Sequence, residues 1–308
     1  QINAESLTSA RIFLLRLIIH KSKEHPMPPT VTKTILCPTC RKLISIDETR
    51  CPYCGTTKPG SWMHNNPVAR IFNDPARFIK GIIYINVGMF VISILFSFQE
   101  LSLSIGNPLK FLSPDIRFIG LLGATGTVPI DQMHRWWTLL SASYLHGGIL
   151  HILFNMMAFR QISALIIREY GIHRMFSIYT LGGIIGCWAS YLGGTHVTIG
   201  ASAAICSLIG AALYYGKSRG GIYGQAIYRQ IGGWVLMIFL FGFMIPGIDN
   251  WGHGGGIAGG ILLGFLFGYH ERKKETRLHR ALARLCVLAT AIVLLWAIGS
   301  SVYYLTHA

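Results

Sequence analysis

A serine and a histidine lie in separate apolar segments of the chain, where reactive groups are rare. Ser202 follows Gly200 near the start of one segment, and His253 stands near the start of another that continues with three glycines. A serine hydroxyl attacks a carbonyl carbon when a neighbouring histidine accepts its proton. Because ionisable groups are costly inside a membrane, those found there usually serve a function. The pair therefore predicts a serine hydrolase built inside a membrane.

A third apolar segment carries His151 and Asn155, which are four residues apart. On a helix this spacing puts both side chains on one face, where each offers an N–H donor. Ser202 lies at the expected start of its helix, so its backbone amide has no partner within the helix and favours nearby negative charge. The Ser202 amide is therefore what an oxyanion hole requires, and His151 and Asn155 can direct their donors toward a common point. No carboxylate is expected beside Ser202 or His253, so the reacting pair would be a Ser-His dyad.

Small residues line the two segments that carry this pair. Glycine recurs at every fourth residue from 252 to 268, and the segment around Ser202 is rich in alanine and glycine. Such stripes let membrane helices approach to backbone contact. We therefore expect the two helices to pack together and to bring Ser202 within hydrogen-bonding reach of His253.

The elements that position these residues are apolar helices. Hydrophobic residues make up 52% of the 308 residues, charged residues only 13%, and the mean hydropathy is +0.47, which indicates an integral membrane protein. Runs of about 20 apolar residues predict an all-α polytopic helical bundle. The expected spans are 80–98, 146–167, 174–192, 200–216, 230–248, 252–269 and 283–305.

The formal net charge of +15 is compatible with nucleic-acid binding or with a basic membrane face. The lysines and arginines cluster at alternate membrane boundaries, which favours the basic face, with lipid as a partner and no nucleic acid. Under the positive-inside rule the N-terminus is cytoplasmic, and the loop 99–135 is external. The expected location is the bacterial inner (plasma) membrane. The basic side carries Lys80, Arg168, Arg174, Lys217, Arg219, Arg229, Arg272, Lys273, Lys274, Arg277, Arg280 and Arg284.

Four of the seven cysteines form two Cys-x-x-Cys pairs separated by ten residues: Cys37, Cys40, Cys51 and Cys54. Two such turns can direct four thiolates toward one tetrahedral zinc ion. A module this small cannot bury a sufficient hydrophobic core and needs a bound metal or a cross-link to fold. Two disulfides or a redox pair are the alternatives, and a cytoplasmic location favours zinc. The segment resembles zinc-ribbon modules that precede the membrane domain in some bacterial membrane proteins, with room for a cytoplasmic protein partner.

A larger set of residues, spread over the membrane region, forms an ordered pattern. These residues are Arg135, Trp136, Trp137, Thr138, His146, His151, Asn155, Gly200, Ala201, Ser202, Asn250, His253, Gly256 and Gly260. On these motifs, residues 78–270 resemble the rhomboid family of intramembrane serine proteases. The resemblance implies six core helices, Ser202 as nucleophile, His253 as general base, and an oxyanion hole of His151, Asn155 and the Ser202 amide. It also implies single-span membrane proteins as substrates and no cofactor for catalysis.

Three positions depart from that family pattern. His134 replaces a tryptophan beside Arg135, so we expect weaker anchoring of the external loop. Ala203 replaces the glycine after the nucleophile, and its methyl group is expected to crowd the approach to the hydroxyl. Cys206 replaces an aromatic residue that packs against the catalytic histidine, so His253 is expected to be held less firmly.

The preferred function is cleavage of transmembrane helices near the external membrane face. The alternative is a catalytically inactive rhomboid-like scaffold that binds transmembrane helices, and retention of both Ser202 and His253 argues against it. For the N-terminal extension, translation from Met27 is an alternative start. The expected domains are an extension at 1–30, a zinc ribbon at 31–58, a linker at 59–79, a six-helix rhomboid-like domain at 80–270, a basic linker at 271–282, and a seventh transmembrane helix and tail at 283–308.

Overall fold

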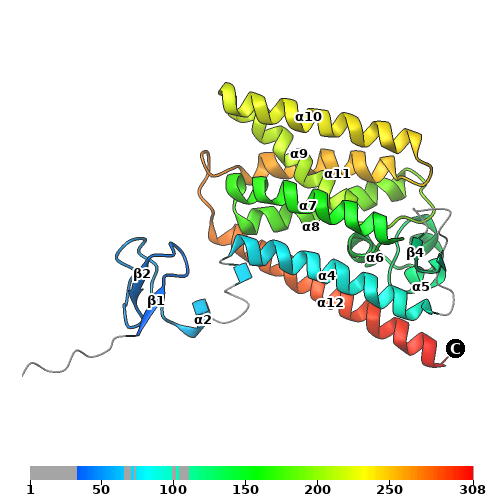
Figure 1. Cartoon of the computed structure of the whole chain (residues 1–308), viewed down its shortest axis with the longest axis horizontal. Helices are drawn as coiled ribbons and strands as arrows, with labels where there is room; N and C mark the ends of the chain where they lie inside the picture. The colour runs from blue at the N-terminus through cyan, green and yellow to red at the C-terminus, as the bar shows by residue number, and fades with distance from the viewer. Residues whose placement is uncertain (1–32, 66–70, 73, 99–101, 104–110, 308) are drawn as a thin grey trace, which may run out of the picture. The chain divides into compact units, whose positions relative to one another are not determined.

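The structure is a computed structural model that describes residues 33–65, 71–72, 74–98, 102–103 and 111–307 (Figure 1). The chain divides into two compact units, residues 1–70 and 71–308. The N-terminal extension expected at 1–30 lies outside the described residues. The division falls within the expected linker at 59–79, and the finer domain boundaries remain predictions.

The first unit is built around a short antiparallel hairpin. Strand β1 (Thr34–Leu36) pairs with β2 (Leu43–Ser45), and a single helical turn, α2 (Trp62–Asn65), follows. A cluster this small does not stabilise a fold by itself, so the unit depends on what its cysteines bind. The buried residues that cluster in the described part of this unit are Cys37, Ile44 and Cys51.

The second unit is a bundle of long helices (Figure 1). They are α4 (Pro75–Phe96), α7 (Ile149–Tyr170), α8 (Ile172–Leu192), α9 (Ser202–Arg219), α10 (Gly221–Met244), α11 (Asn250–Phe267) and α12 (Arg277–His307). Five of them, α4, α7, α8, α10 and α12, are long and apolar enough to cross a membrane. The chain is an integral membrane protein, and the predicted polytopic helical fold is confirmed. Helices α9 and α11 fall outside this group, because small and polar residues lower their hydropathy.

Some helices begin earlier than the expected spans. Helix α10 begins at Gly221 rather than near 230, because Gly220 and Gly221, with φ of 66° and 63°, end α9 and start α10 within one tight turn. Helix α12 begins at Arg277 rather than near 283, since residues 277–282 are mostly good helix formers, while two arginines and a histidine among them lower the hydropathy. Hydropathy locates the apolar part of a helix, and these helices continue beyond it.

The segment between α4 and α7, expected as an external loop, contains several short elements. Their described members are β3 (Ser102–Leu103), β4 (Phe111–Ser113), α5 (Ile116–Leu121), the π-helical turn η3 (Val128–Gln132), α6 (Thr138–Ser141) and the 3-10 turn η4 (Ala142–Tyr144). Thr125 forms an isolated bridge with Thr198, which ties this segment to the loop before α9. None of these elements has enough length to show a hydrophobic period.

Helices α8, α9 and α11 form the centre of the second unit, and α10 packs mainly on α9. Helix α12 packs along α8 and also contacts α5 and α6. Its buried side chains recur at three- and four-residue intervals, which places them on one face. The seventh helix is therefore an integral part of the bundle. The buried residues on this face include Ala283, Cys286, Thr290, Leu294, Ala297 and Ser301.

Candidate active site

Ser202 is the first residue of α9 and follows a turn that requires glycine. Gly200 has φ of 123°, and a Cβ atom at this position would lie 2.7 Å from Nε2 of His151. The Gly200 amide donates to the Ala142 carbonyl at 2.9 Å, which fixes the turn. The Ser202 amide has no hydrogen-bond partner among the described residues, as expected in the first turn of a helix. Helix α9 therefore presents the Ser202 hydroxyl and a free N–H at the same end.

His253 lies near the start of α11, and Asp249 fixes that start. One carboxylate oxygen of Asp249 accepts a hydrogen bond from the Gly252 amide at 2.9 Å, and the other accepts one from the Ser190 hydroxyl of α8. We expected no carboxylate beside His253, yet Asp249 precedes it by four residues. Asp249 is used to cap α11 and to join it to α8, and Nδ1 of His253 is buried without a partner in the described structure. The geometry therefore offers His253 no carboxylate hydrogen bond.

His151 and Asn155 lie one turn apart on α7. The Gly147 amide donates to Nδ1 of His151 at 3.3 Å, which leaves the ring hydrogen on Nε2, the atom beside Gly200. Nδ2 of Asn155 donates to the His151 carbonyl at 2.8 Å and has a second hydrogen to offer. His146, just before the helix, is buried edge-on to His151 with 5.1 Å between ring centroids. Two side-chain donors are thus available near the start of α9.

The close packing expected between α9 and α11 is present. A Cβ atom at Gly260 would overlap the carbonyl group of Ser207, and one at Gly256 would overlap the carbonyl group of Ala203. The two helices are therefore in direct backbone contact along this stripe. Because a side chain at either glycine would have to displace backbone, the contact fixes the separation of the helices that carry Ser202 and His253.

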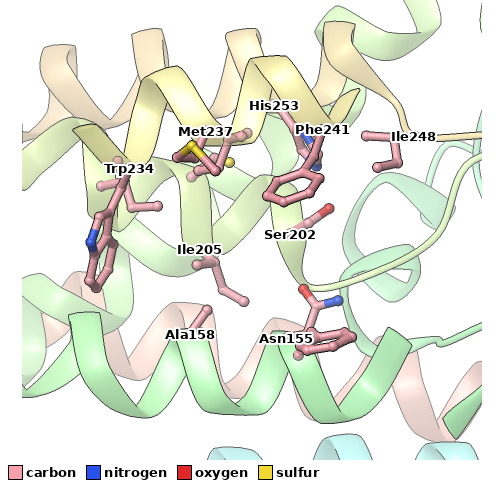
Figure 2. Close-up of a pocket in the computed structure, with 13 residues that line it drawn as sticks. Asn155, Ala158, Ser202, Ile205, Trp234, Met237, Phe241, Ile248 and His253 are labelled. Carbon is pink, nitrogen blue, oxygen red and sulfur yellow. The ribbon is translucent and has the colours of Figure 1, made fainter. Parts of the chain in front are cut away.

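A pocket of about 350 Å³ brings residues of four helices together (Figure 2). Ser202, His253 and Asn155 lie toward one end of it, and Trp234 lies at the other (Figure 2). His151 does not line the pocket, although its Nε2 borders the Gly200 turn. Within the described part of the chain, no hydrogen bond joins the Ser202 hydroxyl to the His253 ring. The other lining residues are largely apolar and include Ile205, Cys206, Met237, Ile238 and Phe241.

Two of the departures noted in the sequence lie on different sides of α9. Ala203 is buried in a small cluster with Cys187 of α8 and does not line the pocket. The expected crowding of the nucleophile is therefore wrong, because the rotation of α9 directs this methyl group toward α8. Cys206 does line the pocket with His253, and a Cβ atom at Gly256 of α11 would lie 3.1 Å from its own Cβ.

Arg135 and its neighbours connect the segment before α6 to the rest of the bundle. The Arg135 guanidinium donates to the Gly120 carbonyl of α5 at 3.3 Å. Trp136 packs edge-on against Tyr191 of α8, with 5.5 Å between ring centroids. The loop that we expected to be weakly anchored because of His134 therefore has contacts with both α5 and α8.

The four cysteines of the first unit converge on one point, as predicted. Their Sγ atoms lie within 4.8 Å of one another, with 3.6 Å between Cys37 and Cys54 and between Cys40 and Cys51. Zn–S bonds of about 2.3 Å in a tetrahedron place sulfur atoms roughly 3.8 Å apart, whereas a disulfide requires about 2.05 Å. Hydrogen bonding to Thr56 lowers the pKa of the Cys54 thiol to about 6. The cluster has the donor set and the size to hold a metal ion.

A rhomboid domain model matches residues 133–270. The chain is 33% identical over 145 residues to the rhomboid relative YdcA of Bacillus subtilis, covering 46% of this chain and 71% of YdcA. It is 37% identical over 127 residues to rhomboid protease GluP of the same bacterium, covering 41% of this chain and 25% of GluP. Identity to RHOMBOID-like protein 4 of Arabidopsis thaliana is 32% over 173 residues, or 56% of this chain and 43% of that protein. The matched region thus spans less than half the length of the last two relatives.

Proposed function

Because the chain belongs to the rhomboid family, we propose that it is an intramembrane serine endopeptidase with Ser202 and His253 as a catalytic dyad. Ser202 Oγ attacks the peptide carbonyl carbon, while His253 accepts the hydroxyl proton and returns it to the leaving amine. Water then hydrolyses the acyl-enzyme. The oxyanion accepts hydrogen bonds from the Ser202 amide, His151 Nε2 and Asn155 Nδ2.

One observation supports this proposal most directly. Ser202, His253 and Asn155 come from three different helices, and they line one pocket whose other walls are apolar (Figure 2). Polar groups are costly in apolar surroundings unless they are hydrogen-bonded, so those that occur there usually serve a function. Their convergence beside the free amide of Ser202 supplies a nucleophile, a base and oxyanion donors at one place.

The exposed walls of the pocket support a transmembrane helix as substrate. Helices α7 and α10 form two of these walls, where Phe154 is 62% exposed and Phe241 is 48% exposed. In a bilayer such side chains contact lipid, so an apolar segment can approach between them without crossing a polar surface. We propose that the substrates are single-span membrane proteins, cleaved near the membrane face where Ser202 lies.

A fluorophosphonate probe tests the proposed nucleophile on the purified full-length protein. Such a probe forms a covalent bond only with an activated serine. We expect labelling of wild type, none of Ser202→Ala, and little of His253→Ala. Ser207→Ala is the matched control, because Ser207 lies on the same helix and its hydroxyl donates to the Ile178 carbonyl of α8. Equal labelling of wild type and Ser202→Ala would exclude Ser202 as the nucleophile.

A catalytically inactive scaffold that binds transmembrane helices is the second candidate. It is favoured by the lack of a hydrogen bond between Ser202 and His253 in the described structure, and by the small side chain of Cys206, which lines the same pocket as His253. The same probe separates the two functions. A folded wild-type protein that binds a transmembrane peptide but neither reacts with the probe nor cleaves the peptide is a scaffold.

For the first unit we propose that Cys37, Cys40, Cys51 and Cys54 hold one structural zinc ion. The convergence of four thiol groups at zinc-like separations supports this proposal. Purified protein should contain about one zinc ion per chain, and the Cys37→Ser, Cys40→Ser variant should lose it. Zinc-free protein in which these two cysteines are linked covalently would favour the disulfide alternative.

We further propose that the basic side of the bundle and the cysteine module face the cytoplasm of a bacterium, with the membrane being the inner membrane. The alternation of basic loops supports this orientation. A reporter fused after Lys217 should be cytoplasmic, and one fused at Thr195 should be external. The reverse pattern would place the cysteine module outside and weaken the argument for reduced cysteines and for a cytoplasmic partner.

A further inference from the structure

A second pocket, of about 330 Å³, lies at the junction of α9 and α10, at the end of α9 opposite Ser202. It differs from the active-site pocket in being lined mainly by polar and cationic groups. These groups are Lys217 in the last turn of α9, the backbone at Gly216 and Gly220, and Gln225, Tyr228 and Arg229 of α10. Nothing in the proposed proteolytic reaction uses them.

The two cations of this pocket have no acidic partner among the described residues. Other arginines nearby are paired: Arg168 with Glu169 at 2.7 Å, and Arg219 with Glu271 at 3.0 Å. The Lys217 ammonium lies 5.6 Å from the centre of the Tyr228 ring. The pocket therefore holds two positive charges that no acidic group of the described chain neutralises.

Backbone packing keeps the pocket in shape. A Cβ atom at Gly216 would lie 2.8 Å from the Tyr228 amide nitrogen and 2.9 Å from the Gly224 carbonyl oxygen, so α9 and α10 touch beside the pocket. Gln225 and Arg229 are four residues apart on α10, which places them on one face together with Tyr228. The helix contact therefore presents Lys217 from one helix toward these side chains from the other.

An apolar surface continues from the pocket along α10. Gly232 has nothing within 4 Å of an added Cβ atom, and neither has Gly233. Leu236, one turn further on, is 61% exposed. The polar pocket thus opens onto a shallow strip of helix on which an acyl chain can lie. A free phosphate ion would contact only the polar pocket, whereas a phospholipid would place its headgroup in the pocket and an acyl chain on the strip.

We propose that this pocket binds the phosphate-bearing headgroup of an anionic phospholipid. Lys217 and Arg229 neutralise the phosphate, Gln225 and the Tyr228 hydroxyl offer hydrogen bonds, and one acyl chain follows the Gly232–Leu236 face of α10. The site lies between α9 and α10, and α10 also contributes Trp234 to the active-site pocket. Bound lipid therefore restrains α10. Lipid binding itself does not depend on the proposed proteolysis.

Native mass spectrometry of the full-length protein in neutral detergent tests this proposal directly. Phosphatidylglycerol is titrated against phosphatidylcholine, and retained lipid is counted for each variant. The Lys217→Gln, Arg229→Gln variant should bind phosphatidylglycerol on the order of 10²-fold more weakly, about tenfold for each charge-assisted contact with the phosphate that is lost. Arg280→Gln, Arg284→Gln is the matched control, because both arginines are exposed at the basic end of α12 and the same charge is removed. The control should change binding by less than about twofold.

Three results would overturn the proposal. An equal loss in both double variants would show diffuse attraction to the basic surface rather than a site. Undiminished binding in the Lys217→Gln, Arg229→Gln variant, with an unchanged thermal midpoint, would exclude these cations. Inorganic phosphate that displaces the lipid at low millimolar concentration and remains bound would identify a free anion as the ligand. A charge-conserving Arg229→Lys variant should keep most of the binding, since the site relies on charge.

Discussion

The active-site pocket has two walls that are built in different ways. The wall formed by α9 and α11, which we call the rigid wall, is held by backbone contact, as at Gly256 and Gly260. The wall formed by α10, which we call the exposed wall, has few contacts with the bundle. Only 17% of the apolar part of α10 is buried, against 61% for α8. The first wall carries Ser202 and His253, and the second contributes apolar side chains alone.

This difference matches two unlike requirements of the proposed reaction. A nucleophile and a base have to be held to within a fraction of an ångström, because misplacement by about 1 Å can reduce the rate roughly 10²-fold. Admission of a substrate helix requires a wall that can move without disrupting the core. Close-packed backbone resists displacement, whereas a helix that mostly faces lipid has few contacts to lose. The proposed reacting groups thus lie on the closely packed wall of the pocket, and the proposed entry side lies on the exposed wall.

The largest expected effect comes from removing the reacting groups on the rigid wall. Ser202→Ala and His253→Ala should each reduce cleavage of a single-span substrate to background, since loss of a nucleophile or its base in serine hydrolases costs on the order of 10⁶-fold. Cleavage is measured in proteoliposomes, with the thermal midpoint recorded for each variant. Full activity of folded Ser202→Ala would refute the mechanism, and the rigid wall would then not carry the nucleophile.

A smaller loss is expected from α7, which belongs to both sides of the comparison. This helix carries the two proposed side-chain oxyanion donors, His151 and Asn155, and also forms part of the exposed wall. His151→Ala and Asn155→Ala should each lower kcat by about 10²- to 10³-fold and leave measurable activity, because the remaining donors still hold the oxyanion. A change in KM alone would instead assign the residue to the entry wall.

The third prediction concerns stability and compares one glycine from each wall. Gly260→Ala should lower the free energy of unfolding by about 1 to 3 kcal/mol, since the new methyl group overlaps the Ser207 carbonyl. Gly233→Ala on α10 should be neutral or stabilising by roughly 0.5 to 1 kcal/mol, because that position is open and alanine favours helix. Unfolding in mild detergent, followed by circular dichroism, measures both. Similar losses in the two variants would mean that α10 is packed as tightly as α11.

The rigid wall was largely predictable from the sequence, whereas the exposed wall was not. A four-residue glycine period indicates helix contact whatever the orientation of the rest of the bundle, and the four-residue spacing of His151 and Asn155 fixes a common face. The contribution of Trp234 and Met237 to the pocket depends on how α10 is rotated about its axis. A uniformly apolar helix contains no signal for that rotation.

Two local features show which details of the site the sequence does and does not indicate. The direction of the Ala203 methyl group depends on the rotation of α9, so the expectation that it crowds Ser202 was wrong. Asp249, by contrast, could have been found, because an aspartate just before a glycine-rich helix is a typical N-cap. Its bond to Ser190 of α8 joins residues 59 positions apart and could not have been found in this way.

The smallest expected effect lies at Cys206, which lines the pocket together with His253 and packs near Gly256. We expect a larger side chain at this position to contact the imidazole and to restrict its orientation. Cys206→Phe should raise the cleavage rate, by less than the roughly 10²-fold that a misplacement of about 1 Å costs. Overpacking against α11 can offset the gain with a loss of about 1 to 3 kcal/mol in stability.

Cys206→Ser provides the control, because it keeps the small size and should leave the rate nearly unchanged. Rates are compared at a temperature at which all three proteins are folded, as judged from their thermal midpoints. An unchanged rate in folded Cys206→Phe would show that His253 is already held by the backbone contact of α9 and α11. If wild type is inert on several substrates, and a folded Cys206→Tyr variant is inert as well, the two walls form a binding groove and the scaffold function replaces the protease.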